Sequence, residues 1–166
     1  FESGSTTPIP NATVSAGGNS TLTDSAGYYN ITVPGNRVHN LVSIKTGYNT
    51  NITSVNTTIG ETEEVNLTMS KFYGFVGPNA TISGYVRDNS TNVSIANVTI
   101  SIAGVNNLSN ATGNYSLIIS EGPHVIVAVK NGYKNFVGNF SIKGNQNLSY
   151  IINMTSVTVG EETING

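Results

Sequence analysis

The sequence predicts an all-β protein made of two tandem antiparallel β-sandwich modules, and two observations support this prediction. Residues that favour strands (Val, Ile, Thr and Tyr) are plentiful, whereas the helix formers Glu, Lys, Arg, Gln, Leu and Met are scarce. No stretch of the chain has the apolar spacing of a helix. In addition, short alternating runs are separated by turn residues about every eight to twelve positions, which is typical of a sandwich.

The chain repeats itself once. A shift of 85–86 positions places IPNATVSAGGNSTLTDSAGYYNITV (9–33) on IANVTISIAGVNNLSNATGNYSLII (95–119), and VSIKTGY (42–48) on VAVKNGY (127–133). A shared spacing over this length indicates duplication. We therefore predict module one at residues 1–70, a linker at 71–79, module two at 80–155, and a strand-donor or linker segment at 156–166.

The alternating runs of module two predict its strands in order. They lie near 81–88, 95–103, 107–110, 113–119, 124–130, 134–142 and 147–154. The turns between them carry Gly, Pro, Asn and Asp, for example in the runs DNS (88–90), NATG (110–113), EGP (121–123) and KGN (143–145). Module one follows the same plan, with DSAG (24–27) and PGN (34–36) in the corresponding turns.

Several short motifs in both modules resemble one family. Module two carries TISGYVRD, SIANVTISI, NATGNYSLII and EGPHVIVAVKNGY, and module one carries PIPNATV, TDSAGYY, VPG and KTGY. Together they resemble the carboxypeptidase regulatory-like domain, a transthyretin- or Ig-like β-sandwich. The resemblance covers nearly the whole chain and implies that fold. It also implies a non-catalytic role, because such modules are non-catalytic parts of many exported proteins.

The charge of the chain excludes several classes of partner. Only 10% of the residues are charged and the net charge is −2, against roughly 25% charged residues in ordinary soluble domains. We therefore expect no nucleic-acid partner. No apolar run reaches the roughly 20 residues of a membrane helix, so we expect no membrane insertion. The absence of cysteine excludes disulfides and cysteine-ligated zinc.

Asn-x-Ser/Thr triplets, the acceptors of N-glycosylation, recur from end to end. The sixteen triplets begin at Asn11, Asn19, Asn30, Asn51, Asn56, Asn66, Asn79, Asn89, Asn92, Asn97, Asn107, Asn110, Asn114, Asn139, Asn147 and Asn153. Random placement of the same residues would give about five or six. Alternation along strands explains part of the excess, because it puts polar residues two apart. It explains neither why Asn leads nor why Lys and Glu are rare.

We therefore predict N-glycosylation at several of these sites, with glycan supplying the hydration that charge does not. Asn97 and its repeat equivalent Asn11 are the first candidates. We expect Asn97-Val98-Thr99-Ile100 to form a strand, with Asn97 and Thr99 facing solvent and Val98 and Ile100 facing the core.

The chain offers little for catalysis. His39 and His124 are repeat equivalents and should lie in separate modules, where each is a framework residue. Asp24 heads a turn and has no acidic neighbour for a calcium site. Glu61, Glu63 and Glu64 should lie on a solvated edge. We predict that the protein is not an enzyme and holds no cofactor and no metal.

The two ends of the sequence match the first strand of module two. Module two begins with TISGYVRD (81–88), whereas module one begins with FESGS. TING (163–166) followed by FESGS overlays that strand, with Gly166 on Gly84 and Phe1 on Tyr85. We predict a subunit interface at Phe1, Glu2, Ser3, Thr163, Ile164, Asn165 and Gly166. Residues 163–166 would complete the first strand of the next unit, in a covalent polyprotein or by strand donation between chains.

These patterns predict a structural subunit of an extracellular, heavily N-glycosylated filament or tandem array, joined head to tail. Its partners would be copies of itself and covalently attached N-glycans, and the triplet density without cysteine favours an archaeal or bacterial cell surface. The alternative is a non-catalytic adhesin or carbohydrate-binding module of a larger cell-surface protein.

Overall fold

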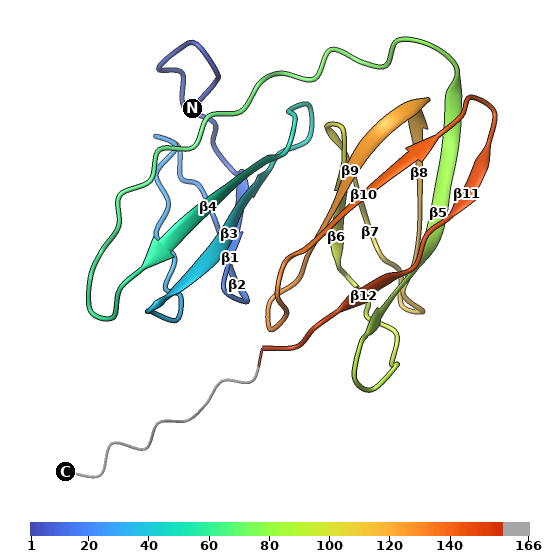
Figure 1. The fold of residues 1–166 in the computed structure, drawn as a ribbon. Helices are drawn as coiled ribbons and strands as arrows, with labels where there is room; N and C mark the ends of the chain where they lie inside the picture. The colour runs from blue at the N-terminus through green and yellow to red at the C-terminus, as the bar shows by residue number, and fades with distance from the viewer. Residues whose placement is uncertain (158–166) are drawn as a thin grey trace.

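The protein is all-β, as predicted. The computed structural model describes residues 1–157, and among them it has twelve strands and no helix (Figure 1). The names module one (residues 1–70) and module two (residues 80–155) are kept below for the two halves of the repeat.

The repeat produces the same four-stranded antiparallel sheet twice. In module one the sheet has the order β2-β1-β3-β4, and in module two the equivalent strands have the order β7-β6-β9-β10. The strands of the first sheet are β1 (Thr13–Ala16), β2 (Asn19–Leu22), β3 (Arg37–Ile44) and β4 (Asn51–Thr57). Those of the second are β6 (Thr99–Ile102), β7 (Val105–Leu108), β9 (Gly122–Val129) and β10 (Phe136–Ile142).

A second sheet covers the first one in module two. It consists of β5 (Asn79–Asp88), β8 (Asn114–Ser120), β11 (Asn147–Ser149) and β12 (Ile152–Met154). The long strand β5 is its centre: β8 pairs with it antiparallel, and β11 and β12 pair with it parallel. Ile82 and Val86 of β5 are fully buried against Ile100 and Ile152 in the core between the two sheets.

Module one lacks the second sheet that its repeat predicts. Residues 28–34 are equivalent to β8 and residues 62–69 to β11 and β12, yet among the described residues neither segment forms a strand. A single parallel bridge, Glu2 with Met69, remains of the β5–β12 pairing. In module two β5 pairs with all three of these strands, whereas among the described residues of module one only residues 1–3 pair at the equivalent place.

The two modules contact each other through their four-stranded sheets. Val42 and Ile44 of β3 form a buried apolar cluster with Val127 and Val129 of β9. These four residues are two pairs of repeat equivalents. The contact therefore uses equivalent positions of the two modules, as expected of two surfaces related by a two-fold axis.

The rim of this contact repeats in the same way. The Phe72 and Val157 amides, one repeat apart, donate to the Gly47 and Gly132 carbonyls, each at 2.8 Å. The Phe72 side chain lies against Gly104 of module two, and the Val157 side chain lies against Gly18 of module one. A Cβ on Gly104 would come within 2.5 Å of Phe72 Cβ, and a Cβ on Gly18 within 2.6 Å of Val157 Cγ2. Both glycines are thus required by close packing.

Candidate functional site

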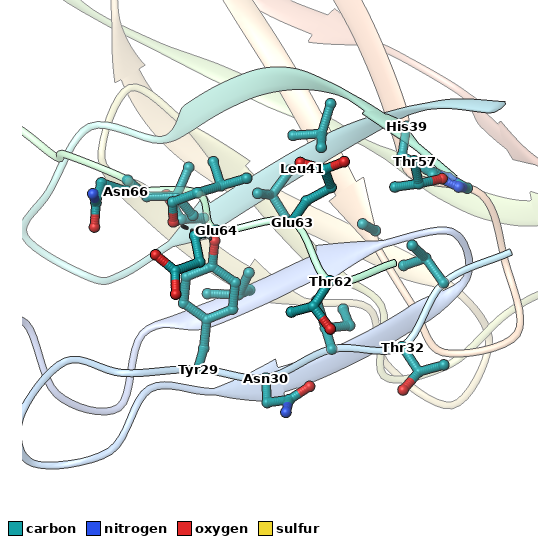
Figure 2. A pocket seen from close by; sticks show the side chains of 18 of the residues that line it. Tyr29, Asn30, Thr32, His39, Leu41, Thr57, Thr62, Glu63, Glu64 and Asn66 are labelled. Carbon is teal, nitrogen blue, oxygen red and sulfur yellow. Dashed lines mark hydrogen bonds between the residues drawn. The ribbon is translucent and has the colours of Figure 1, made fainter. Parts of the chain in front are cut away.

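A groove of about 810 Å³ opens in module one where β5 lies in module two (Figure 2). Its lining comes from residues 27–33, from residues 57–67, and from the sheet, where Val14, Leu41 and Val55 contribute. The first two segments are the equivalents of the strands that flank β5. We call this site the module-one groove.

Apolar side chains along the groove are less buried than their equivalents in module two. Leu117 and Ile119 of β8 are 4% and 0% exposed, because β5 packs beside them. Their equivalents Ile31 and Val33 are only half-buried and line the module-one groove. The groove therefore carries an apolar stripe of the kind that a further strand would cover.

A tyrosine marks the path of the strand in both modules. In module two the Tyr115 hydroxyl donates to the Tyr150 carbonyl at 2.8 Å, and Gly84 of β5 pairs with Tyr115 between them. In module one the equivalent Tyr29 hydroxyl donates to the Val65 carbonyl, also at 2.8 Å. Burial raises the pKa of Tyr29, so the hydroxyl stays protonated and remains the donor.

Residues 1–3 form one end of the groove and pair with residues 67–69. The Phe1 ammonium donates to the Leu67 carbonyl at 2.8 Å, and the Met69 amide donates to the Phe1 carbonyl at 2.9 Å. The Ser3 amide completes the pairing by donating a hydrogen bond of 3.0 Å to the Met69 carbonyl. Phe1, Glu2 and Ser3 of the predicted interface thus pair within their own chain, and their contact with another subunit stays a prediction. Thr163, Ile164, Asn165 and Gly166 lie outside the described residues.

The pairing of Met69 corrects the predicted overlay of the two first strands. Glu2 pairs with Met69, and Asp88 pairs with the equivalent Met154. Phe1 therefore occupies the place of Arg87, two residues beyond the predicted place of Tyr85. The overlay was wrong because a match of four or five residues cannot fix the register of a strand, whereas the backbone pairing does.

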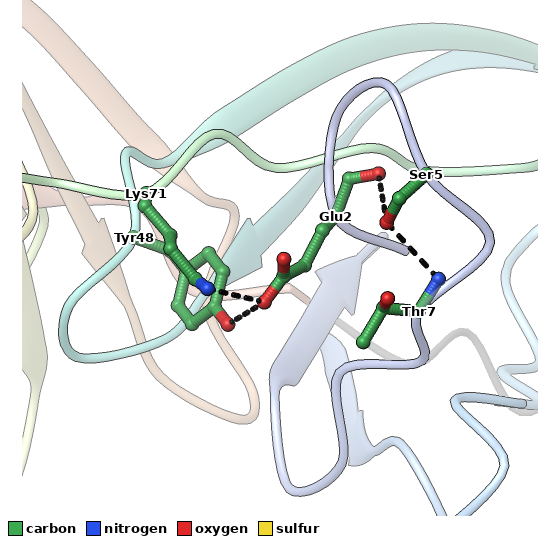
Figure 3. A network of polar contacts seen from close by, with 5 residues as sticks. All are labelled: Glu2, Ser5, Thr7, Tyr48 and Lys71. Atoms are coloured by element: carbon green, nitrogen blue, oxygen red, sulfur yellow. Dashed lines mark hydrogen bonds and ion pairs between the residues drawn. The ribbon is translucent and has the colours of Figure 1, made fainter.

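A small polar network attaches residues 1–3 to the rest of module one (Figure 3). Glu2 Oε1 accepts a hydrogen bond of 2.6 Å from the Tyr48 hydroxyl and lies 3.2 Å from Lys71 Nζ. The bond from Tyr48 and the ammonium of Lys71 lower the pKa of the Glu2 carboxyl. Module two keeps part of this arrangement: Tyr133, the equivalent of Tyr48, lies beside Asp88, and Ser156 stands in the place of Lys71.

The asparagines of the triplets lie at the surface. Fifteen of the sixteen are exposed, and only Asn51 is half-buried. Asn11 and Asn97 differ from the prediction in backbone conformation: both have φ of 53°, in turns just before β1 and β6 rather than in the strands. The residues that follow them, Ala12 and Val98, are buried as predicted. Exposure is a requirement for attachment, and attachment itself stays a prediction.

The histidines and Asp24 have framework roles. His39 Nε2 contacts the Pro34 carbonyl at 2.7 Å, and His124 Nε2 contacts the Ser120 carbonyl at 2.8 Å, each within its own module. Asp24 Oδ1 accepts from the amides of Ala26 and Tyr28, both at 2.9 Å. In the described part of the chain, no three His, Cys, Asp or Glu residues are grouped so that they could hold a metal ion.

The acidic run of module one lies at a site that the sequence did not predict. Glu61, Glu63 and Glu64 are exposed, as expected, but they also line the module-one groove. A signal was present in the repeat: the run aligns with residues 146–149, which include the strand β11 beside β5. The equivalence of Tyr29 to Tyr115 could also have located the groove.

No protein-family model matches the chain, and no curated protein matches it. Among solved structures, the chain is similar to the TIE protein of Bacillus anthracis, with 15% identity, a TM-score of 0.42, and coverage of 90% of this chain and 32% of that one. BcpA, the major pilin subunit of Bacillus cereus, has 11% identity and a TM-score of 0.42, with 76% of this chain and 41% of that one covered.

A third similar structure, the 5-hydroxyisourate hydrolase of Klebsiella pneumoniae, has 19% identity and a TM-score of 0.35 over 46% of this chain and 87% of that one. The chain spans less than two thirds of the length of the TIE protein and of BcpA. At these TM-scores the likenesses carry no argument for function. Within residues 1–157, no helix has the length and apolar character needed to cross a membrane.

Proposed function

We propose that this protein is a structural subunit of an extracellular, heavily N-glycosylated filament or tandem array, joined head to tail by completion of a β-sheet. The observation that supports this function is the module-one groove. In module two the same place holds β5, the strand that pairs with β8, β11 and β12. A strand from elsewhere would restore this sheet in module one.

Backbone chemistry favours such an addition. An added strand gives the backbone groups of residues 28–34 and 62–66 ladder partners, and main-chain hydrogen bonds supply much of the affinity in strand addition. The strand would also cover Ile31 and Val33. Full burial of a Val or Ile side chain contributes ~1.5–3 kcal/mol relative to full exposure, and these half-buried residues would gain part of that.

The donor that we propose is the segment at residues 163–166 of a neighbouring copy. Its sequence TING matches TISG (81–84) of β5, the strand that fills the equivalent place in module two. The groove belongs to module one and the donor follows module two, so the contact joins two different surfaces. Such a contact builds an open chain of subunits unless it closes into a ring. A covalent tandem array and separate chains both satisfy this geometry.

The contact between the modules suits a load-bearing subunit. The buried valines and Ile44 in the centre, and the close glycine contacts at the rim, hold the two sheets together. Because its modules are packed in this way, each subunit would keep a fixed orientation between its own groove and its donor end. Filament stiffness would then come from the packing of the modules rather than from a flexible linker.

Glycosylation and location belong to the same proposal. The exposed triplet asparagines are distributed over both modules, and the charged fraction of 10% leaves hydration to other groups. Glycan at several of these sites would supply it. We place the protein outside the cell, at an archaeal or bacterial surface. BcpA is a pilin subunit, but the proposal rests on the groove.

Electron microscopy of the full chain tests this function. The proposal predicts fibres whose axial repeat is one two-module unit. Val33→Asp puts a charge on the apolar stripe of the groove and should abolish the fibres. Leu22→Asp is the matched control, because Leu22 lies in the same module, is 58% exposed and does not line the groove. Discrete particles from the unaltered chain would overturn the proposal and favour an isolated adhesin-like module.

A further inference from the structure

We propose that the module-one groove selects its strand by a glycine: it accepts an extended peptide with the pattern apolar-x-Gly, with the glycine opposite the Val65 carbonyl. In the donor segment, Gly166 is this glycine and Ile164 is the apolar residue. The inference rests on the proposed function and adds the register and the sequence requirement of the strand.

Module two shows why a glycine is needed. Gly84 of β5 passes beside the Tyr150 carbonyl, to which the Tyr115 hydroxyl is bonded at 2.8 Å. The backbone of β5 is held there, because the Tyr150 amide donates to the Ser83 carbonyl at 2.8 Å. A Cβ on Gly84 would overlap the Tyr150 carbonyl oxygen. Backbone meets backbone at this point, so no side-chain rotation can relieve the overlap.

Module one has the same pair of groups on either side of the groove. Tyr29 and Val65 are the repeat equivalents of Tyr115 and Tyr150, and their hydrogen bond has the same length of 2.8 Å. We call this pair the glycine subsite. A strand that follows the path of β5 through module one must pass the glycine subsite. A side chain at that position would overlap the Val65 carbonyl, just as a Cβ on Gly84 would overlap the Tyr150 carbonyl.

An apolar subsite lies two residues before the glycine along the strand. In module two it holds Ile82, which is fully buried and pairs with Leu117. In module one the equivalent of Leu117 is Ile31, which is half-buried beside the groove. The strand that fills the groove therefore needs an apolar side chain two positions before its glycine.

The segment TVGEETING (158–166) satisfies both subsites in one register. With Gly166 at the glycine subsite, Ile164 enters the apolar subsite. With Gly160 there instead, Thr158 would take the apolar subsite, where its hydroxyl fits less well than an aliphatic side chain. The apolar subsite therefore selects the first register.

Binding of labelled peptides to the full-length chain tests this inference. The peptide 158–166 should bind and stop fibre growth, whereas Gly166→Val and Ile164→Asp should each weaken its binding about tenfold or more, a change equivalent to ~1.4 kcal/mol. Gly160→Val is the matched control, because it adds the same side chain outside the two subsites, and its affinity should stay within about twofold of the parent.

The outcomes distinguish strand completion, on which the proposed function rests, from the glycine requirement. Failure of the unaltered peptide to bind would overturn strand completion itself, and with it the proposed function. Binding of the unaltered and Gly166→Val peptides with equal affinity would keep strand completion and overturn the glycine requirement. A larger loss for Gly160→Val than for Gly166→Val would also overturn it, because it would assign the subsite to the other glycine.

Discussion

Ser15 of module one and Asn135 of module two are joined by two hydrogen bonds across the contact between the modules. Ser15 Oγ donates to Asn135 Oδ1 at 2.8 Å, and Asn135 Nδ2 donates to the Ser15 carbonyl at 3.0 Å. The repeat equivalents of this pair, Ser101 and Thr50, share a hydrogen bond of 2.6 Å on the other side of the contact. Equivalent positions of the repeat thus form hydrogen bonds on both sides of the contact between the modules.

Loss of the Asn135 amide should loosen this contact. Asn135→Ala removes both bonds to Ser15 and a third, of 3.2 Å, to the Asn40 carbonyl. Because these partners lose their bonds in a partly buried place, we expect the free energy of unfolding to fall by ~1–3 kcal/mol. Denaturant unfolding measures it. Asn131→Ala, which removes one exposed bond to Ser20, should cost less. Equal losses would contradict the assigned role.

The Glu2 network should make stability depend on pH. Its bonds to Tyr48 and Lys71 hold the pKa of Glu2 below the ordinary value of 4.5. A carboxyl with a lowered pKa in the folded state stabilises the protein above its unfolded pKa, and this contribution is lost as the pH falls through the folded pKa. We expect the Tm to fall below about pH 4.5 more steeply in the native chain than in Glu2→Gln. Parallel curves would contradict the network.

Like charges should slow capture of the donor strand. Glu63 and Glu64 line the groove, and the donor segment carries Glu161 and Glu162. Added salt screens such repulsion, since the Debye length falls from ~10 Å at 0.1 M to ~3 Å at 1 M. Light scattering should therefore show faster fibre growth with salt. The double change Glu63→Gln and Glu64→Gln should speed growth at low salt and flatten its salt dependence. An unchanged salt dependence would count against this assignment.

Gly84 should tolerate alanine less well than Gly132 of the same module. Gly84→Ala forces a Cβ against the Tyr150 carbonyl, and overpacking of this kind costs ~1–3 kcal/mol. Gly132→Ala is the control, because its φ of 83° is strained for alanine but nothing lies within 4 Å of the added Cβ. Thermal unfolding should show the larger loss for Gly84→Ala. The reverse order would remove the basis for the glycine subsite.

Glycan should be found first at exposed positions in both modules. Mass spectrometry of glycopeptides from the native material should show modification at Asn11 and Asn97, which lie exposed in turns. Asn51, which is half-buried and donates to the Thr68 carbonyl at 2.8 Å, should be the least occupied. Asn11→Gln removes the acceptor amide and should therefore remove one glycan mass. Unmodified peptides throughout would exclude glycan as the source of hydration.

The sequence predicted local structure well and long-range consequences less well. Alternation and turn residues located β5, β8, β9 and β10 to within a few residues, because these signals are local. The single sheet of module one was not predicted. Ile31 and Val33 have the pattern of a strand, but a strand forms only with a partner, and pairing is not a local property. Likewise, the repeat identifies Val42 and Val127 as equivalent positions, but it does not show that they pack on each other.

Amide hydrogen exchange of assembled and dissociated full-length protein tests strand completion most directly. We predict that the amides of residues 28–33 and 62–67 exchange rapidly in the dissociated chain and become protected on assembly, while those of β1 and β3 are protected in both states. The same protection should appear when the peptide 158–166 is added to the dissociated chain. Unchanged exchange in both segments on assembly would contradict completion of the sheet by an added strand.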